Sequence, residues 1–252
     1  MKFFFLIIFF NIIFYNYSYA TCLKGSCIEG NGKIIFSDEK TYTGSFKNGS
    51  LNGEGTMTFS SGKKYIGLFK NNLFDGKGTL IIPDNSKYYG TFKNDLYDGY
   101  GTLTFFDGRV YKGSFSKNLF DGYGTLINSD GSKFSGMFKK GFIEGYGTMN
   151  YADGTKYTGM IFNNPDYKGY KGANGYGVKV FSDGSIYRGM FSGGIFSGYG
   201  TMIYSNKTSY SGTFSNGLYH GYGIYNDGLK DHSGYWYKGK LNTGFKEINS
   251  IN

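Results

Sequence analysis

The stretch "DGYGTLTFFDGRVYKGSF" occupies residues 98–115, and "DGYGTLINSDGSKFSGMF" occupies residues 121–138. The two stretches place their glycines and aromatic residues alike, the first beginning at Asp98 and the second at Asp121. A fixed period of this length, about 23 residues, is typical of repeat proteins, in which each repeat packs against its neighbours. The fold of the chain therefore depends on the secondary structure that one repeat unit forms.

The same unit recurs along most of the chain. Each copy begins with an aromatic residue and has a glycine two residues later, and all but the copy at Tyr157 carry a G-x-G eleven residues after the start. The copies begin at Tyr42, Tyr65, Tyr88, Tyr111, Phe134, Tyr157, Tyr187 and Tyr210. Every step has the same length except the one that begins at Tyr157, which contains seven more residues than the others. Half-units precede and follow the series, "GNGKIIFSDEK" from Gly30 and "YKGKLNTG" from Tyr237.

Each unit is predicted to form two short β-strands. "YYGTFK" (88–93) and "YGTLTFF" (100–106) alternate and are rich in Tyr, Phe and Thr, and the 43 glycines exclude helices. Asp-Gly pairs such as Asp107-Gly108 favour a tight hairpin turn, whereas "NDLYDG" (94–99) is expected to be a longer loop. We therefore predict an all-β, elongated antiparallel β-meander of about eight β-hairpin repeats.

The N-terminus has the pattern of an export signal. "MKFFFLIIFFNIIFYNYSYA" (1–20) has a basic Lys2, an apolar run, and small residues before a cleavage position at Thr21. The apolar run is shorter than the roughly 20 residues that span a bilayer. We expect a signal peptide and a secreted, periplasmic or cell-envelope protein. The remaining segments are a partial repeat with the cysteines (21–41), five regular repeats (42–156), an irregular repeat (157–186), and two repeats with a half-repeat (187–252).

Cys22 and Cys27 are the two cysteines of the chain. In an oxidising compartment they can bond to each other or to another chain. A structural disulfide is the interpretation that we favour. A metal held by this pair alone would leave two tetrahedral positions empty.

The repeat resembles the MORN (membrane occupation and recognition nexus) family. The motifs are "YIGLF" at 65, "YYGTF" at 88, "YKGSF" at 111, "FSGMF" at 134, "YRGMF" at 187 and "YSGTF" at 210, each followed by G-x-G. The resemblance implies a twisted β-meander without chemistry of its own, acting as a scaffold, dimerisation module or membrane adaptor. The departures are Ile161 at the usual Phe position, the insertion "NNPDYKGYKGA" before Gly175, and "HSGYW" at 232.

Strand alternation assigns residues to two faces. Tyr88, Gly90 and Phe92 are expected on a packed face, where glycine lets a neighbouring ring lie across bare backbone. The second strand is expected to add Gly99, Gly101, Leu103 and Phe105 to this face.

The opposite, outer face carries the candidate binding residues. A tyrosine lies between two glycines in six repeats: Tyr100, Tyr123, Tyr146, Tyr176, Tyr199 and Tyr222. The candidate lysines are Lys64, Lys87, Lys93, Lys133, Lys139 and Lys156. Acidic residues are placed instead in the connections, as Asp98, Asp121 and Glu144 are.

Several roles for this face stay open. Cross-strand Tyr, Thr and Lys suit any solvated sheet surface. The functional hypothesis is a docking surface for a protein partner or a second copy, in which repeated weak contacts add up. The alternatives are an anionic membrane, which the net charge of +9 would favour, and a carbohydrate stacked on the tyrosines. Nucleic acid is not expected, because only Arg109 and Arg188 are available for phosphate recognition.

Enzymatic motifs are not found in the sequence. His220 replaces an acidic loop residue and His232 lies in the irregular last unit, so neither is placed as a catalytic base. The aspartates recur as turn formers rather than as a catalytic pair. We predict no catalytic residues, no metal site and no cofactor.

Overall fold

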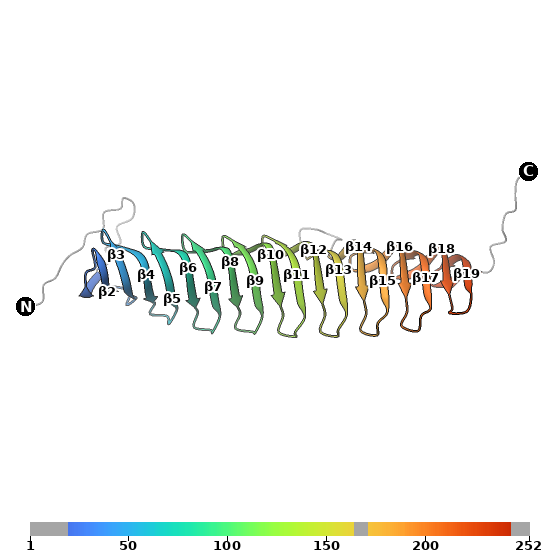
Figure 1. The fold of residues 1–252 in the computed structure, drawn as a ribbon, viewed down its shortest axis with the longest axis horizontal. Coiled ribbons are helices and arrows are strands. Elements are labelled where there is room, and N and C mark those ends of the chain that lie inside the picture. Colours follow the sequence, from blue (N-terminus) through green and yellow to red (C-terminus); the bar gives the residue numbers. More distant parts are fainter. Residues whose placement is uncertain (1–19, 164–170, 243–252) are drawn as a thin grey trace, which may run out of the picture. The chain divides into compact units, whose positions relative to one another are not determined.

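The computed structural model describes residues 20–163 and 171–242, and its regular elements there are all β-strands (Figure 1). The chain divides into two units, one ending at Phe120 and one beginning at Asp121. The predicted signal peptide, up to residue 19, and residues 164–170 of the insertion lie outside the described residues.

In the first unit, each strand pairs with the next one along the chain in antiparallel orientation. Its complete strands are β1 (Ala20–Gly25), β2 (Gly30–Phe36), β3 (Thr41–Lys47), β4 (Ser50–Thr58), β5 (Lys64–Lys70), β6 (Leu73–Ile81), β7 (Lys87–Lys93), β8 (Leu96–Thr104) and β9 (Val110–Ser116).

The second unit follows the same rule from β10 onward. Its strands are β10 (Leu119–Ile127), which begins just before the unit, β11 (Lys133–Lys139), β12 (Phe142–Asn150), β13 (Lys156–Phe162), β14 (Gly172–Val180), β15 (Ile186–Ser192), β16 (Ile195–Ile203), β17 (Ser209–Ser215), β18 (Leu218–Asn226), β19 (Asp231–Tyr237) and β20 (Lys240–Leu241). The predicted all-β antiparallel meander of hairpin repeats is confirmed.

The two connections of a repeat are the reverse of what the sequence predicted. Between β7 and β8 only Asn94 and Asp95 intervene, and their φ angles of 49° and 67° are those of a type I′ turn. The expected longer loop at 94–99 was therefore wrong. Asn and Asp tolerate positive φ, so this tight turn needs no glycine.

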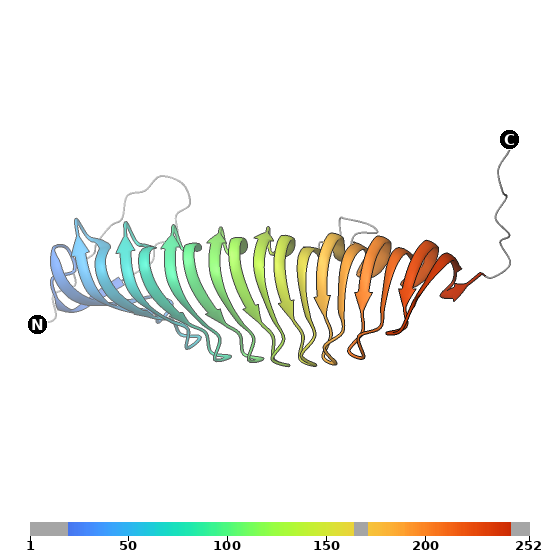
Figure 2. The same ribbon diagram turned by 45° about the vertical axis from the view of Figure 1, so that its right-hand side comes forward.

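The Asp-Gly pairs lie in the longer connection. Residues 105–109 join β8 to β9, and the amide of Phe105 donates a hydrogen bond of 2.8 Å to the carbonyl oxygen of Arg109. Gly108 has a φ of 87°, and its amide donates back to the carbonyl oxygen of Phe105 at 3.1 Å. Figure 2 shows these connections at the ends of strongly curved strands.

A β-bulge interrupts the second strand of each regular repeat. In β7 and β8, Gly90 pairs with Gly101 and Phe92 pairs with Tyr97, so Thr91 alone opposes residues 98–100. Gly99 is exposed, has a φ of 91°, and lies beside Thr91 rather than among the packed rings. The prediction that Gly99 lies on the packed face was wrong, because the alternation of side chains along a strand does not hold across a β-bulge.

The packed face is a series of aromatic rings. Tyr88 is fully buried and lies over the Gly90–Gly101 pair. Its ring stacks on Tyr97, with 3.8 Å between centroids, and meets Phe92 and Phe115 edge to face at 5.0 and 5.1 Å. Each repeat therefore packs on the Phe of the next, and the ring contacts link neighbouring repeats.

The stacked partner was not singled out from the sequence. It stands nine residues after the first tyrosine of the unit, and the pairs are Tyr65–Phe74, Tyr88–Tyr97, Tyr111–Phe120, Tyr187–Phe196 and Tyr210–Tyr219. An aromatic residue recurring at this position was the available signal.

The acidic residues hold turns. An Asp98 carboxylate oxygen accepts a hydrogen bond from the amide of Lys117 at 3.4 Å, and Asp121 accepts one from Lys140 at 3.2 Å. In the longer connection, hydrogen bonds from Ser132 hold the pKa of Asp130 below its ordinary value. These carboxylates are engaged in local structure, which leaves lysine and tyrosine prominent on the outer face.

Candidate binding face

A glycine-flanked tyrosine is exposed at the same position of six repeats. We call Tyr100, Tyr123, Tyr146, Tyr176, Tyr199 and Tyr222 the tyrosine row. Each lies in an even-numbered strand, immediately before a glycine that pairs with a glycine of the following strand, and their side chains are 55–68% exposed. The flanking glycines add no side chain beside them along the strand, which leaves much of each ring accessible to a partner.

The row is mostly a feature of the second unit. Tyr100 belongs to the first unit and the other five to the second. At the same position of the repeat, the first unit has exposed Asn31, Glu54 and Lys77. Although the backbone of this position repeats in both units, aromatic character is concentrated in the second.

Methionines accompany the tyrosines, and the sequence analysis missed them. Met137 pairs with Tyr123, and Met190 with Tyr176; these methionines are 42% and 41% exposed. Met160 pairs with Tyr146 and is half-buried. The signal in the sequence was a methionine three residues after the first aromatic residue of three units, those that begin at Phe134, Tyr157 and Tyr187. Tyr and Met are both enriched at the buried centres of protein interfaces.

The candidate lysines lie at strand ends rather than among the tyrosines. Lys87 pairs with Thr104, four residues along β8 from Tyr100, and Lys133 pairs with Ile127, four residues along β10 from Tyr123. Lys87, Lys93, Lys133, Lys139 and Lys156 are exposed and Lys64 is half-buried. Lys139 also lies 3.0 Å from the carboxylate of Glu144. The structure therefore places the lysines at the edges of the face and the tyrosines in its middle.

A shallow hollow separates two members of the row. It measures about 290 Å³ and is lined by Tyr176, Tyr199, Arg188, Thr201, Gly189 and Gly200. The two glycines pair with each other across β15 and β16, so bare backbone forms part of its lining. Beside it, the hydroxyls of Thr201 and Ser211 hydrogen-bond at 2.9 Å. Aromatic walls with a few donors and acceptors suit peptide or sugar binding.

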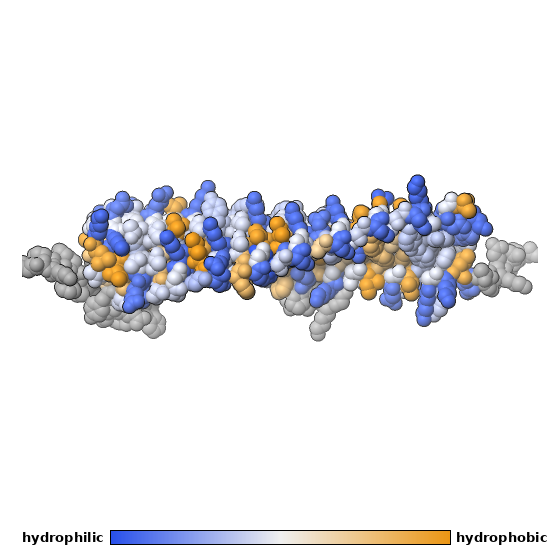
Figure 3. Space-filling view, turned by 90° about the horizontal axis from the view of Figure 1, so that it is seen from below, coloured by the Kyte–Doolittle hydropathy of each residue, from blue (hydrophilic) through white to orange (hydrophobic). Residues whose placement is uncertain are grey.

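Figure 3 shows one side of the molecule coloured by hydropathy. Hydrophobic residues appear there in separate clusters between hydrophilic ones, rather than as one continuous patch. Tyrosine and threonine are intermediate on this scale, so a tyrosine surface is not distinguished by colour. Recognition by such a surface depends on ring geometry more than on bulk hydropathy.

The two histidines have structural partners. His232 Nε2 lies 2.6 Å from an Asp227 carboxylate oxygen, and this contact holds the pKa of Asp227 below its ordinary value. The carbonyl oxygen of His220 accepts a hydrogen bond from Tyr210 at 3.4 Å. In the residues that the structure describes, three His, Cys, Asp or Glu side chains do not gather as metal ligands would.

A second hollow lies at the irregular last unit. His232 pairs with Tyr225 at the place where a buried aromatic residue begins other units. About 430 Å³ is open there between Tyr204, Asn206, Thr208, Tyr219, Tyr225, Trp236 and Gly239. The hydroxyls of Tyr204 and Tyr219 hydrogen-bond to each other. This hollow continues the aromatic packing of the core and lies apart from the tyrosine row.

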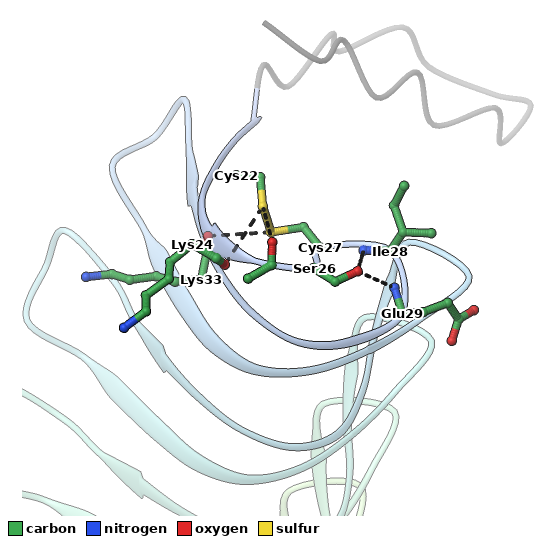
Figure 4. The surroundings of a disulfide bond; sticks show 8 residues. Cys22, Lys24, Ser26, Cys27, Ile28, Glu29 and Lys33 are labelled. Atoms are coloured by element: carbon green, nitrogen blue, oxygen red, sulfur yellow. Dashed lines mark hydrogen bonds between the residues drawn. A yellow bond between two sulfur atoms is a disulfide. The ribbon is translucent and has the colours of Figure 1, made fainter. Parts of the chain in front are cut away.

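Cys22, in β1, and Cys27, in the loop that follows β1, form a disulfide (Figure 4). Their Cα atoms are 6.0 Å apart, and Cys27 is buried. Ser26 Oγ accepts a hydrogen bond of 3.0 Å from the amide of Glu29 in the same loop. The disulfide thus ties the first strand to the loop that leads into β2.

An antiparallel meander of hairpin repeats, with an exposed side-chain row running from repeat to repeat, defines a repeat-protein scaffold. The MORN repeat model matches residues 42–64, 65–87, 88–108, 111–133, 134–156, 171–186, 187–209 and 210–229. These matches cover more than half of the chain, so the protein belongs to the MORN repeat family. MORN repeats are non-catalytic and generally act as protein-binding or membrane-binding scaffolds.

Solved structures resemble the chain only distantly. One is the SAS-4 (dCPAP) TCP domain of Drosophila melanogaster in complex with a proline-rich motif of Ana2 (dSTIL); at 14% identity and a TM-score of 0.40, it covers 66% of this chain and 86% of that one. Another is the TCP10 domain of Danio rerio CPAP, at 10% identity and a TM-score of 0.28, covering 74% and 88%. No curated protein matches the chain. Similarity at this level supports no conclusion about a partner.

None of the elements at residues 20–163 and 171–242 is a helix with the length and apolar content that crossing a bilayer requires.

Proposed function

We propose that the protein is a non-enzymatic scaffold that binds a protein partner through the tyrosine row of its second unit. The observation that carries the proposal is one exposed, glycine-flanked tyrosine in each of five consecutive repeats of that unit. Tyrosine combines a large apolar ring with a hydroxyl, at a low entropic cost on binding. A repeat whose outer face only contacted solvent would not need a tyrosine between the two glycines. In the first unit, Asn31, Glu54 and Lys77 occupy that position.

Repetition makes weak contacts useful. A partner that touches several tyrosines at once binds with the combined strength of contacts that are individually weak. The methionines between the tyrosines add a flexible apolar surface, and the lysines at the edges favour partners with acidic flanks. A second copy of the chain is one such partner, which makes self-association part of this proposal.

Export of the chain is also proposed. The pattern of residues 1–20 is that of a signal peptide, and a disulfide close to the expected new N-terminus suits an oxidising compartment. Expressing the full chain in a secreting host and determining the N-terminal residue of the recovered protein tests this. A protein that stays in the cytosol with its first residues intact contradicts export.

The test of partner binding compares two triple variants. Tyr123→Ser, Tyr146→Ser and Tyr176→Ser together should abolish recovery of the native partner after crosslinking in the native compartment, while circular dichroism and the melting temperature stay unchanged. The matched control replaces Asn31, Glu54 and Lys77 with serine, at the same repeat position in the first unit. Undiminished partner recovery by the tyrosine variant would eliminate this role for the row.

An anionic membrane is the second candidate, favoured by the exposed lysines at the edges of the face. Each lysine near such a surface contributes about 1 kcal/mol, so four or five would give roughly the 4 kcal/mol of millimolar binding. Sedimentation with vesicles containing phosphatidylserine should then fall sharply between low and physiological salt. Absence of sedimentation at both salt concentrations excludes this candidate.

A further inference from the structure

The spacing of the tyrosine row follows from the sheet. In the second unit its members lie on β10, β12, β14, β16 and β18, with one intervening strand between each two. Adjacent strands are about 4.7–4.9 Å apart, so successive tyrosines recur at roughly 9.5 Å. Because the hydrogen-bonded ladder sets this distance, the sheet holds the period steady over four intervals.

Regular peptide conformations differ in how well they match this period. A polyproline II helix turns once in about three residues at about 3.1 Å each, or roughly 9.3 Å. Over four intervals it stays within about 1 Å of the tyrosine row. An α-helix repeats its heptad face at about 10.5 Å and drifts by about 4 Å over the same length. An extended strand presents one face about every 6.7 Å and does not match.

The chemistry of the row suits the same conformation. A polyproline II segment has no internal hydrogen bonds, so its carbonyl oxygens are free to accept. Tyrosine hydroxyls can donate to them, as can Arg188 and Thr201, which line the hollow between Tyr176 and Tyr199. Proline has no amide hydrogen and needs no acceptor in return. Its ring can enter the space between two aromatic walls, as in other grooves that recognise such segments.

We propose that the tyrosine row of the second unit binds a proline-rich segment in the polyproline II conformation, with a proline at every third residue facing the row. A segment of about 13 residues reaches all five tyrosines. The proposal rests on the proposed protein-binding function and specifies the kind of partner.

Peptides of graded length test this inference with the full chain. The probes are four oligoproline peptides that grow by one helical turn at a time, up to about 13 residues, so that they reach two, three, four and five tyrosines. A fifth probe is the longest peptide with two central glycines, which break the helix. Affinity measured by isothermal titration calorimetry should rise with each added turn, by about tenfold or more in total. The glycine-containing peptide should bind at least fivefold more weakly than the uninterrupted one. Equal affinities across the series, or no binding at all, would overturn the proposal.

Substitutions in the tyrosine row test whether the oligoproline peptide binds there. Tyr176→Ser and Tyr199→Ser should each weaken binding of the longest peptide by about fivefold or more, and Tyr176→Phe, which keeps the ring, should weaken it less than threefold. Replacing Asn31, Glu54 and Lys77 with serine should leave affinity unchanged. Serine variants that bind as wild type does would overturn the assignment to this row.

Two further outcomes distinguish peptide binding from glycan binding, and failure of the polyproline II inference from failure of the proposed protein-binding function. Chito-oligosaccharides have a disaccharide repeat of similar length, so they serve as a second probe. Tyrosine-dependent binding of the sugar without binding of the peptide overturns the proposal and assigns the row to glycans. If oligoproline fails while the triple tyrosine variant still loses its native protein partner, the function stands and the polyproline II inference falls.

Discussion

The hydroxyl of Tyr88 donates a hydrogen bond of 2.9 Å to the carbonyl oxygen of Thr91, three residues along the same strand. Tyr65, Tyr111 and Tyr187 make the equivalent bond to Leu68, Ser114 and Met190 at 2.8, 2.9 and 2.9 Å. This bond explains why a buried first residue of the unit carries a hydroxyl. The partner strand β8 bulges opposite Thr91, and the hydroxyl satisfies a carbonyl next to this irregular pairing.

Phe134 holds the same position without a hydroxyl, so we predict that Phe134→Tyr stabilises the fold. Its ring lies over Gly136 and Gly147, as the tyrosines lie over their glycine pairs. One added hydrogen bond should raise the free energy of unfolding by about 1 kcal/mol. Chemical denaturation measures the change. Tyr88→Phe is the matched opposite and should lower stability by a similar amount; a destabilised Phe134→Tyr variant would show that the position has no room for the hydroxyl.

Glycines under the rings should not tolerate alanine. A Cβ on Gly101 would lie 2.6 Å from Cε2 and from Cζ of Tyr88, so Gly101→Ala should cost about 1–3 kcal/mol through overpacking. Gly131 is the control, because a Cβ there meets nothing within 4 Å. Its φ of 82° is close to the 71° of Asn85, which occupies the equivalent turn position. Gly131→Asn should change stability by under about 0.5 kcal/mol, and equal losses in both variants would contradict the ring-over-glycine explanation.

Alkaline pH should unfold the protein through its buried tyrosines. Burial raises the pKa of Tyr42, Tyr157 and Tyr187 from 10.0 to about 12, and it raises those of Tyr65 and Tyr88 further. Above pH 10 the unfolded chain loses these protons while the folded chain keeps them. This contribution to stability is therefore fully present below pH 10 and is lost as pH rises toward 12.

The measurement is a series of denaturation curves between pH 8 and 12, together with the ultraviolet absorbance of tyrosinate. The buried tyrosines should ionise only as the protein unfolds. Ionisation of these buried tyrosines without loss of structure would contradict their burial.

Removal of the disulfide should loosen the first strand and leave later repeats intact. Replacing Cys22 and Cys27 with serine removes a short-loop constraint that contributes about 2 kcal/mol. Hydrogen exchange should become faster in β1 and β2, while protection in β5–β8 stays unchanged because each repeat contacts only its neighbours. Wild-type protein treated with a reductant should behave like the double variant, and uniform loss of protection across the first unit would contradict this local effect.

The repeat, the strand content and the order of strand pairing all follow from patterns in the amino-acid sequence. Since each unit packs on the next, a constant period along the chain translates directly into successive hairpins. The aromatic start at Tyr88 and the glycine at Gly90 predicted rings over bare backbone, and alternation placed Tyr100 on the outer face. These features depend on residues close together in the chain, so local pattern was sufficient.

Features that depend on the pairing of two strands become visible only in the three-dimensional structure. Cross-strand register produces the bulge that turns Gly99 outward, and it sets Met137 opposite Tyr123. The turn lengths were misjudged because Asn94 and Asp95 adopt positive φ without glycine. Register is a property of two strands at once, and a one-residue difference changes which side chains meet. The spacing of the tyrosine row has the same origin, since it is the distance between hydrogen-bonded strands and not a distance along the chain.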